Sequence, residues 1–297
     1  MLSSHAIVSK CRVNAREEDV ASNKRVSCVL QEIRKRAGTQ EGARISAAEA
    51  DDYHVHIVSK NTFPTAAGLA SSAAGYACLS KHSPLSSLLS PCVIGFVFGV
   101  KESYEGELSS IARIGSGSAS RSLDGGFVRW NVGTKADGTD SVASQVAPAG
   151  HWPELEILIL VVSAAKKDVG STAGMSDSVN TSELLKHRVA HVVEPRLKAI
   201  EDAYKAKDFP TFAKIAMQDS NQFHAVCADT YPPIYYMNDV SRKIVNLVHK
   251  INAAAGEVVA GYTYDAGPNA VLLAEKKNMP LLLAVMSQHF DIPGVDK

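Results

Sequence analysis

The residues best suited to chemistry in this 297-residue chain begin with PTAAGLASSAAG, residues 64–75. A glycine-containing loop that opens a helix presents unpaired backbone N–H groups at the positive helix end, which is a cradle for phosphate. Ser71 and Ser72 add hydroxyl donors for phosphate or for the oxygens around Mg²⁺. The segment matches neither the Walker P-loop nor the G-x-G-x-x-G pattern. A tight strand-to-helix turn, made of small residues for close packing, is the alternative interpretation.

A second glycine- and serine-rich segment, GSGSASRS at residues 115–122, contains Arg121. The planar guanidinium is suited to a bidentate grip on a carboxylate or a phosphate. The segment is therefore a candidate anion site, and a flexible surface loop is the alternative.

Two further candidates lie in the second half of the chain. Asp265, in YTYDAGPNA, follows an apolar strand and is an acid that can take a hydroxyl proton; an Asx-turn is the alternative. In KKDVGSTAGM, residues 166–175, two lysines precede Ser171 at a predicted helix start, in reach of a diphosphate. A solvated position is favoured for Lys166.

His187 and His191 share a helix face, but exposed histidines are favoured over a metal site.

The elements that must position these residues follow from hydrophobic periodicity. Helices are predicted over 15–36, over 73–79, at the start of 106–126, from Asn180 with Glu183 completing its cap, from a cap at Asp239, and over 281–289. Strands are predicted over 54–59, 126–132, 155–163 as a fully buried strand, 257–263 and 270–274. Segment 82–104 combines prolines, serines and the apolar octet Val93 to Val100, an aggregation hazard if exposed.

Composition excludes several classes of protein. With 45% hydrophobic and 21% charged residues the chain is typical of a globular protein, not of a disordered one, a collagen or a coiled coil. Lys+Arg and Asp+Glu are equal at 31, so no bulk attraction to nucleic acid or to an anionic membrane is expected. There is no apolar run of membrane-spanning length and no visible signal peptide, and the five cysteines are dispersed. These features favour the cytoplasm, and the polar stretch 146–154 predicts a domain boundary.

Four motifs, in this order along the chain, resemble mevalonate diphosphate decarboxylase, a family of the GHMP superfamily of small-molecule kinases: NTFPTAAGLASSAAGYA, IARIGSGSASRSLDGGFVRW, DSNQFHAVCADTYPPIYYMND and YTYDAGPNAVLL. The resemblance runs from about residue 10 to the C-terminus, excluding 82–104. It implies an α+β fold, a two-domain GHMP-type α/β sandwich. Residues 1–150 would form a ribosomal-protein-S5-like ATP-binding domain and 151–297 a ferredoxin-like domain. The resemblance also implies a site in the cleft between the domains, and a homodimer.

The resemblance further implies ATP-dependent decarboxylation of mevalonate 5-diphosphate to isopentenyl diphosphate, ADP, phosphate and CO₂, a step toward isoprenoids and sterols. Asp265 would be the catalytic aspartate and Arg121 would hold the substrate carboxylate. Ser116, Ser118 and Ser171 would bind substrate, and Ser72 would contact ATP phosphates. Gly68, Ala70 and Ser71 would complete the nucleotide loop. Mg²⁺ would bind through ATP with few protein ligands.

The chain departs from the family pattern in two places. The family begins with a strand and a K-Y-W-G-K stretch that this sequence lacks, and 82–104 is longer and of different composition than the loop it replaces. These departures favour the hypothesis of a truncated product, incomplete at its start, with little or no activity. The alternatives are a GHMP kinase that stops after phosphorylation and a non-catalytic binding or dimerising remnant.

Overall fold

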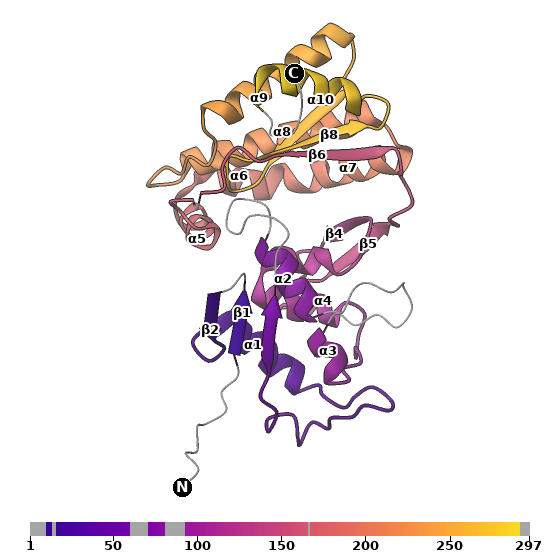
Figure 1. Ribbon diagram of the computed structural model, residues 1–297, viewed down its shortest axis with the longest axis vertical. Helices are drawn as coiled ribbons and strands as arrows, with labels where there is room; N and C mark the ends of the chain where they lie inside the picture. The colour runs from indigo at the N-terminus through magenta and orange to yellow at the C-terminus, as the bar shows by residue number, and fades with distance from the viewer. Residues whose placement is uncertain (1–9, 14–15, 60–70, 81–92, 166, 292–297) are drawn as a thin grey trace. The chain divides into compact units, whose positions relative to one another are not determined.

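The computed structural model describes residues 10–13, 16–59, 71–80, 93–165 and 167–291 (Figure 1). These residues form two compact units; the described part of the first ends at Pro148, and the second begins at Ala149. Helices are mixed with small sheets in both units, which confirms the predicted α+β class. None of the described helices is long and apolar enough to cross a membrane.

The first sheet of the first unit has the order β2–β1–β3. Strand β1 (Lys10–Val13) pairs antiparallel with β2 (Arg16–Asp19) and parallel with β3 (His56–Ser59). The prediction of one helix over 15–36 was therefore wrong at its start, since α1 spans only Lys24–Arg34. Asn23 begins the helix because its side-chain oxygen accepts a hydrogen bond from the Val26 N–H at 3.3 Å.

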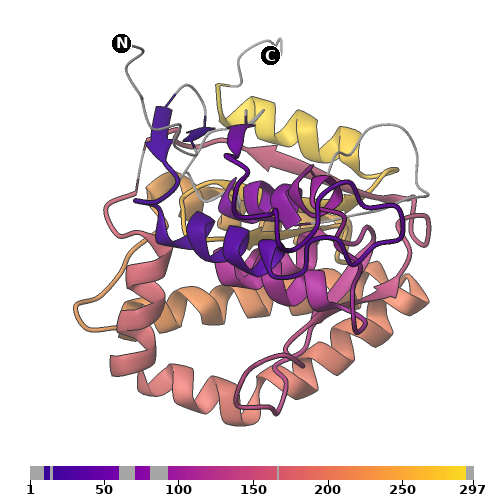
Figure 2. The same ribbon diagram turned by 90° about the horizontal axis from the view of Figure 1, so that it is seen from below.

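The core of this unit is built on the apolar stripe of α1. Helix α4 (Glu107–Gly115) packs beside α1, as Figure 2 shows, and the short helix α3 (Val93–Val97) packs against both α1 and α2 (Ser71–Ser80). The buried members of the cluster include Val26, Val29, Leu30, Ile33, Ile94, Phe98, Val100, Leu108 and Ile111. The apolar octet is thus largely a core element, although Phe96 and Val97 stay exposed; residues 82–92 lie outside the described part.

A charged group is buried within this unit at Glu107, which is 4% exposed. Its carboxylate accepts hydrogen bonds from the Arg36 guanidinium, from the Ser103 N–H at 2.7 Å and from the Ser103 hydroxyl at 2.8 Å. Burial alone would raise the pKa of Glu107, but the Ser103 and Arg36 hydrogen bonds outweigh it and lower the pKa below 4.5.

This arrangement predicts an acid-sensitive contribution to stability. Because the folded pKa lies below the unfolded value, the stabilisation is present above about pH 4.5 and is lost as pH falls through the folded pKa. Glu107→Gln is expected to lower the free energy of unfolding at pH 7 by about 3 kcal/mol, since Arg36 loses the buried one of its two carboxylate partners, Glu107 and Glu32. Thermal melts from pH 3 to pH 7 would show the deficit shrinking in acid. The exposed Glu105→Gln is the control, and equal stability of both variants at pH 7 would contradict the assignment.

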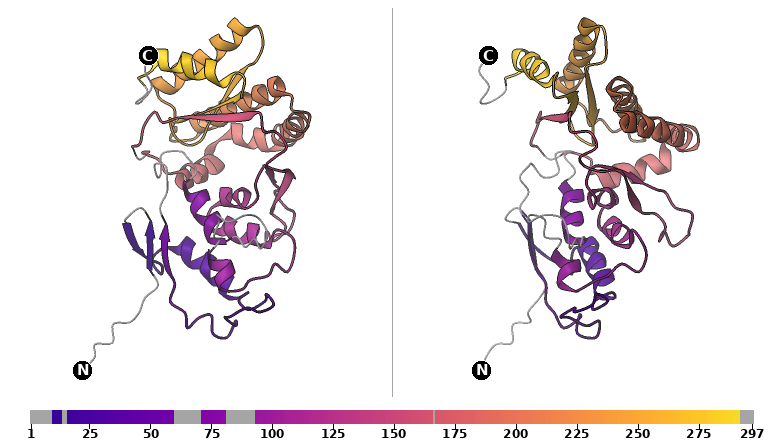
Figure 3. Two further views of the ribbon diagram at one scale, coloured as in Figure 1. Left: turned by 45° about the vertical axis from the view of Figure 1, so that its right-hand side comes forward. Right: turned by 90° about the vertical axis from the view of Figure 1, so that its right-hand side faces the viewer.

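The sheet of the second unit is antiparallel with the order β6–β8–β7. Its strands are β6 (Leu155–Leu160), β8 (Ala270–Glu275) and β7 (Ala260–Tyr264). Helices α9 (Asp239–Ala255) and α10 (Met279–His289) cover one face, and α8 (Phe209–Asp229) lies on the other (Figure 1 and Figure 3). The approach of α8 needs Gly261, where an added Cβ would lie 2.9 Å from the Ala213 Cβ.

The prediction of a fully buried strand over 155–163 was wrong for one face of β6. Leu158 and Leu160 pack against the core, whereas Ile157 and Ile159 are 59% and 51% exposed. The cause is the position of β6 at the sheet edge: α8 packs mainly on β7, at the opposite edge of the sheet.

Two helix caps differ from the predictions by one or two residues. Helix α5 (Ser171–Thr181) continues through Asn180, and Ser182 caps α6 (Glu183–His191) by accepting from the Leu185 N–H at 3.1 Å. The next helix, α7, spans Val193–Ala206. Helix α9 is capped by Asn238 rather than Asp239, because Asn238 and Ser241 satisfy each other's backbone N–H groups in a capping box.

Candidate active site

The two glycine- and serine-rich segments of the first unit meet through their hydroxyl groups. Ser72, on the first turn of α2, has its Oγ 3.3 Å from the Ser116 Oγ, which in turn lies 3.4 Å from the Ser118 Oγ. Ser118 belongs to the 3₁₀ turn η1 (Gly117–Ser122). We call Ser72, Ser116 and Ser118 the hydroxyl cluster. Ser71 begins α2, and Gly68 and Ala70 lie outside the described residues.

Close packing holds the hydroxyl cluster in place. An added Cβ at Gly115 would run into the Tyr76 ring, and one at Gly117 would lie 3.0 Å from Cη2 of Trp130. The Ser120 hydroxyl donates to the Gly117 carbonyl at 2.7 Å. Gly115 is therefore required by the space available and not by a positive φ, and a side chain at Gly117 would have to displace the Trp130 ring.

Ser109 links η1 to the neighbouring hairpin, which is formed by β4 (Phe127–Trp130) and β5 (Ala143–Ala147). The Ser109 hydroxyl donates to the Ser120 carbonyl at 3.3 Å and accepts from the Ala143 N–H at 2.9 Å. The sequence does not predict β5, because the end of this strand overlaps residues 146–154, which predict a domain boundary. The interpretation of 115–122 as a flexible surface loop is wrong, since buried side chains fix the turn.

Arg121 lies at the end of this turn and is exposed, with its guanidinium carbon 5.8 Å from the centroid of the Trp130 ring. A cation over an aromatic face is held in position without losing its hydrogen-bonding edge. Three hydroxyls and a guanidinium thus come from one short stretch and the adjoining helix. Such a donor set is suited to an anionic ligand.

In the second unit, Asp265 is exposed directly after β7. The turn that follows it is anchored at its C-terminal end. The Asn269 side-chain oxygen accepts from the N–H groups of Val162 and Ser163 at 2.7 and 3.0 Å, and the Ser241 hydroxyl donates to the Pro268 carbonyl at 2.8 Å. Asn269 is 1% exposed, so these bonds are shielded from water. These buried hydrogen bonds therefore hold the turn that follows the Asp265 carboxylate in place.

Lys167 connects Asp265 to Ser171, the first residue of α5. Its ammonium donates to the Ser171 hydroxyl at 2.6 Å and to the Ala266 carbonyl at 3.0 Å, and lies 5.6 Å from the centroid of the Tyr236 ring. Burial lowers the pKa of Lys167, and the nearby Asp265 charge works in the opposite direction. The structure thus places Lys167 in contact with the predicted residue Ser171 and with the backbone of Ala266, the residue after Asp265.

The sequence places two lysines in reach of a diphosphate and predicts a solvated position only for Lys166, but it gives Lys167 no individual role. A further signal is the glycine of STAGM. At Gly174 an added Cβ would lie 2.6 Å from the Tyr236 hydroxyl, so α5 must approach the Tyr236 ring that covers Lys167. Burial raises the pKa of Tyr236, which keeps its phenol neutral.

Metal-ligand clusters are absent from the described residues: no three of His, Cys, Asp or Glu gather there. The His187 and His191 rings lie with centroids 4.9 Å apart and planes tilted by 46°, without a third ligand among the described side chains. The hydroxyl cluster offers neutral oxygens and no carboxylate. This donor set fits a metal ion that is carried mainly by phosphate oxygens.

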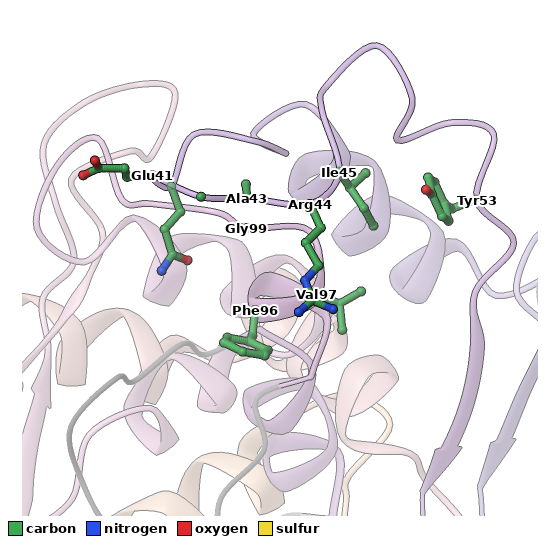
Figure 4. Close-up of a pocket in the computed structure, with 10 residues that line it drawn as sticks. Glu41, Ala43, Arg44, Ile45, Tyr53, Phe96, Val97 and Gly99 are labelled. Carbon is green, nitrogen blue, oxygen red and sulfur yellow. The ribbon is translucent and has the colours of Figure 1, made fainter.

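A pocket of about 540 Å³ elsewhere in the first unit contains none of the predicted site residues. Figure 4 shows the Arg44 side chain beside Phe96 and Val97 in this pocket, with Tyr53 at its margin. Its lining combines apolar side chains and backbone of the loop after α1 and of α3 with two charged residues, Glu41 and Arg44. We assign it no part in the chemistry described below.

Two family models together match most of the chain. The Diphosphomevalonate decarboxylase-like N-terminal domain matches residues 2–143, and the Mevalonate 5-diphosphate decarboxylase C-terminal domain matches residues 157–296. The diphosphomevalonate decarboxylase of Rattus norvegicus is 49% identical over 282 residues, 94% of this chain and 66% of the relative. That of Danio rerio is 49% identical over 285 residues, 96% of this chain and 67% of the relative. The chain thus spans about two thirds of the length of these curated relatives.

Solved structures give the same result. Mevalonate diphosphate decarboxylase from Trypanosoma brucei is 39% identical with a TM-score of 0.85, over 98% of this chain and 71% of that chain. A structure described as a complex with MVAPP, AMPPCP and magnesium is 31% identical with a TM-score of 0.76, over 97% of this chain and 79% of that chain. These similarities confirm the predicted two-domain GHMP-type fold.

Proposed function

The chain belongs to the diphosphomevalonate decarboxylase family, and from this we propose that it is a carboxy-lyase that converts mevalonate 5-diphosphate and ATP to isopentenyl diphosphate, ADP, phosphate and CO₂. The observation that carries the proposal is the meeting of Ser72, Ser116 and Ser118 in one hydroxyl cluster. A relative of known structure was described as a complex with MVAPP, AMPPCP and magnesium, which supports the same pair of ligands for this chain.

Binding is assigned first. Ser116 and Ser118 donate hydrogen bonds to the diphosphate of the substrate, and Ser72 donates to the phosphates of ATP together with the N–H groups of Gly68, Ala70 and Ser71. Arg121 grips the substrate carboxylate with its planar fork. Ser171 contacts the substrate from the start of α5.

The chemical step has to turn a tertiary hydroxyl into a good leaving group. Asp265 orients the 3-hydroxyl and takes its proton, so that the oxygen attacks the γ-phosphorus of ATP. Phosphate then leaves as the C–C bond to the carboxylate breaks and CO₂ departs. Lys167 places a positive charge beside the reacting oxygens. Mg²⁺ carried with ATP beside the Ser72 hydroxyl would supply charge neutralisation.

Several finer assignments belong to the same proposal. The chain works as a homodimer in the cytoplasm, with domains over 1–150 and 151–297. The pathway it serves leads to isoprenoids and sterols. The family membership supports these assignments.

The test is an assay that measures ADP and CO₂ separately, with ATP, Mg²⁺ and mevalonate 5-diphosphate. Equal amounts of both products are expected. ADP without CO₂ would instead identify a kinase that stops after phosphorylation.

Arg121→Lys is expected to raise KM for mevalonate 5-diphosphate by about 10-fold or more, because a point charge cannot replace a bidentate fork. An unchanged KM would remove Arg121 from the carboxylate site.

The non-catalytic alternative is tested by thermal melting. A ligand that binds only the native state raises Tm, so ATP with Mg²⁺ is expected to raise Tm by several degrees at saturating concentration. A broad melt that ATP does not move would favour a binding or dimerising remnant.

A further inference from the structure

The pocket of about 540 Å³ in the first unit shares no lining residue with the hydroxyl cluster. Its walls are the loop after α1 and the end of α3 with the turn that follows it. Figure 1 shows this loop and α3 at the lower end of the first unit, below α2, which carries Ser72. Ligand pockets typically have volumes of about 300–1,000 Å³. The pocket therefore has the size of a site for a small organic molecule that the proposed reaction does not use.

Backbone hydrogen bonds join the two walls of this pocket. The Gly38 N–H donates to the Phe98 carbonyl at 2.9 Å. The Gln40 N–H donates to the Gly99 carbonyl at 2.8 Å. Gly99 adopts a φ of +59°, and a Cβ added there would run into the Ala43 side chain, so the walls meet where no side chain fits. Because these contacts already fix the loop, a ligand has little backbone to order when it binds.

The rest of the loop is anchored to the core and to α1. Ile45 is 7% exposed and belongs to the core cluster of this unit. The Arg34 guanidinium of α1 donates to the Tyr53 carbonyl at 2.6 Å, which holds the residue at the margin of the pocket. The Lys101 N–H donates to the Thr39 hydroxyl at 2.8 Å, just beyond the turn after α3. The pocket is thus formed by the fold itself and does not depend on a ligand.

The pocket combines apolar side chains with a charge that lacks a partner. Figure 4 shows the Arg44 side chain extending to Phe96 and Val97, whereas the Glu41 carboxylate points away from it. Phe96 and Val97 are 64% and 48% exposed, so apolar surface is available beside the guanidinium. Arg44 has no ion pair or side-chain hydrogen bond within the described part of the chain. A guanidinium next to apolar surface is complementary to an anion that carries an apolar group.

We propose that this pocket is a second ligand site, for an organic anion with one compact carboxylate or phosphate head and one apolar chain. The head forms bidentate hydrogen bonds with Arg44, and the chain lies on Phe96 and Val97. Burial of the chain removes apolar surface from water, which adds to the affinity in proportion to the area covered. The Glu41 carboxylate at the rim disfavours a ligand with a second anionic end.

Isothermal titration calorimetry of the chain with octyl phosphate and with octanoate tests the proposal. The better of the two is expected to bind at least about 10-fold more tightly than octanol, which lacks the charge, and than inorganic phosphate, which lacks the chain. Arg44→Gln should weaken this binding about 10-fold or more, because it removes the charged fork. The matched control is Arg242→Gln, at an exposed arginine of α9, which should keep the parent affinity within about twofold. Octanol that binds as tightly as both anions would overturn the proposal.

Val97→Glu is the second variant, since an exposed side chain can be replaced without opening the core. Its carboxylate would lie beside Arg44, pair with the guanidinium and repel the anion, so the affinity should again fall about 10-fold or more. Equal affinity in the parent, Arg44→Gln and Val97→Glu would refute the site.

Competition separates this pocket from the hydroxyl cluster. Saturating ATP, Mg²⁺ and mevalonate 5-diphosphate should leave the affinity for the amphiphilic anion unchanged. Displacement by these compounds would instead place the anion at Ser116 and Ser118 and overturn the proposal. The titration measures no turnover, so its result stands whether or not the chain releases CO₂.

Discussion

Replacing Asp265 by asparagine is expected to lower kcat by about 10³-fold, while KM for mevalonate 5-diphosphate stays within about threefold of the parent value. The amide preserves the size of the side chain and its hydrogen-bonding reach. It removes the lone pair that takes the hydroxyl proton and the negative charge that lies near Lys167. The loss therefore falls on the chemical step and not on substrate binding.

Steady-state release of CO₂ under saturating ATP measures this effect. Asp202→Asn is the control, because Asp202 is an exposed carboxylate of α7 that pairs with the surface residue Lys198 at 2.8 Å. Its kcat should match that of the parent. A normal kcat in Asp265→Asn would remove Asp265 from the mechanism and leave phosphoryl transfer without a base in this unit.

Local chemistry explains which parts of the site could be predicted. The hydroxyl cluster was accessible from the sequence because each segment has its own signature, small residues that open a helix or a turn. Asp265 stood out since a single acid follows an apolar strand and precedes Ala-Gly-Pro. The structure adds that Ser72 and Ser116 meet. The predicted cleft that would bring Asp265 to Arg121 stays a prediction.

The wrong predictions share a physical cause. Hydrophobic periodicity is a local property of the sequence and carries no information about which other elements pack against a segment. Residues 16–19 fit a helical pattern, but they pair with β1, and Asn23 starts the helix later. Strand β6 is apolar throughout, yet it forms a sheet edge, so Ile157 and Ile159 are exposed.

Long-range contacts explain what was missed. Lys167 contacts the Ala266 carbonyl 99 positions away, and Asn269 fastens residues more than 100 positions earlier in the chain. Both residues lie in an ordinary turn or Lys-Lys pair, and each takes its role only from contacts with distant parts of the chain.

Lys167→Met is expected to lower kcat by about 10²-fold, the cost of removing one preorganised donor at a site where charge develops. Its ammonium is already held by Ser171 and the Ala266 carbonyl, so no reorganisation is needed when the phosphoryl group moves. Methionine has a comparable length and keeps the contact with the Tyr236 ring. KM for ATP is expected to rise less than kcat falls.

The pH dependence separates charge from packing. Because burial lowers the pKa of Lys167, its charge is lost before that of exposed lysines as pH rises, so kcat of the parent should decline on the alkaline side. That decline should be absent from the residual activity of Lys167→Met and retained in Lys198→Met, a control on the exposed face of α7. If Lys167→Met keeps the alkaline decline, the group that titrates is another one. If it also keeps its kcat, the cation beside Asp265 serves to hold α5 against the turn and takes no part in phosphoryl transfer.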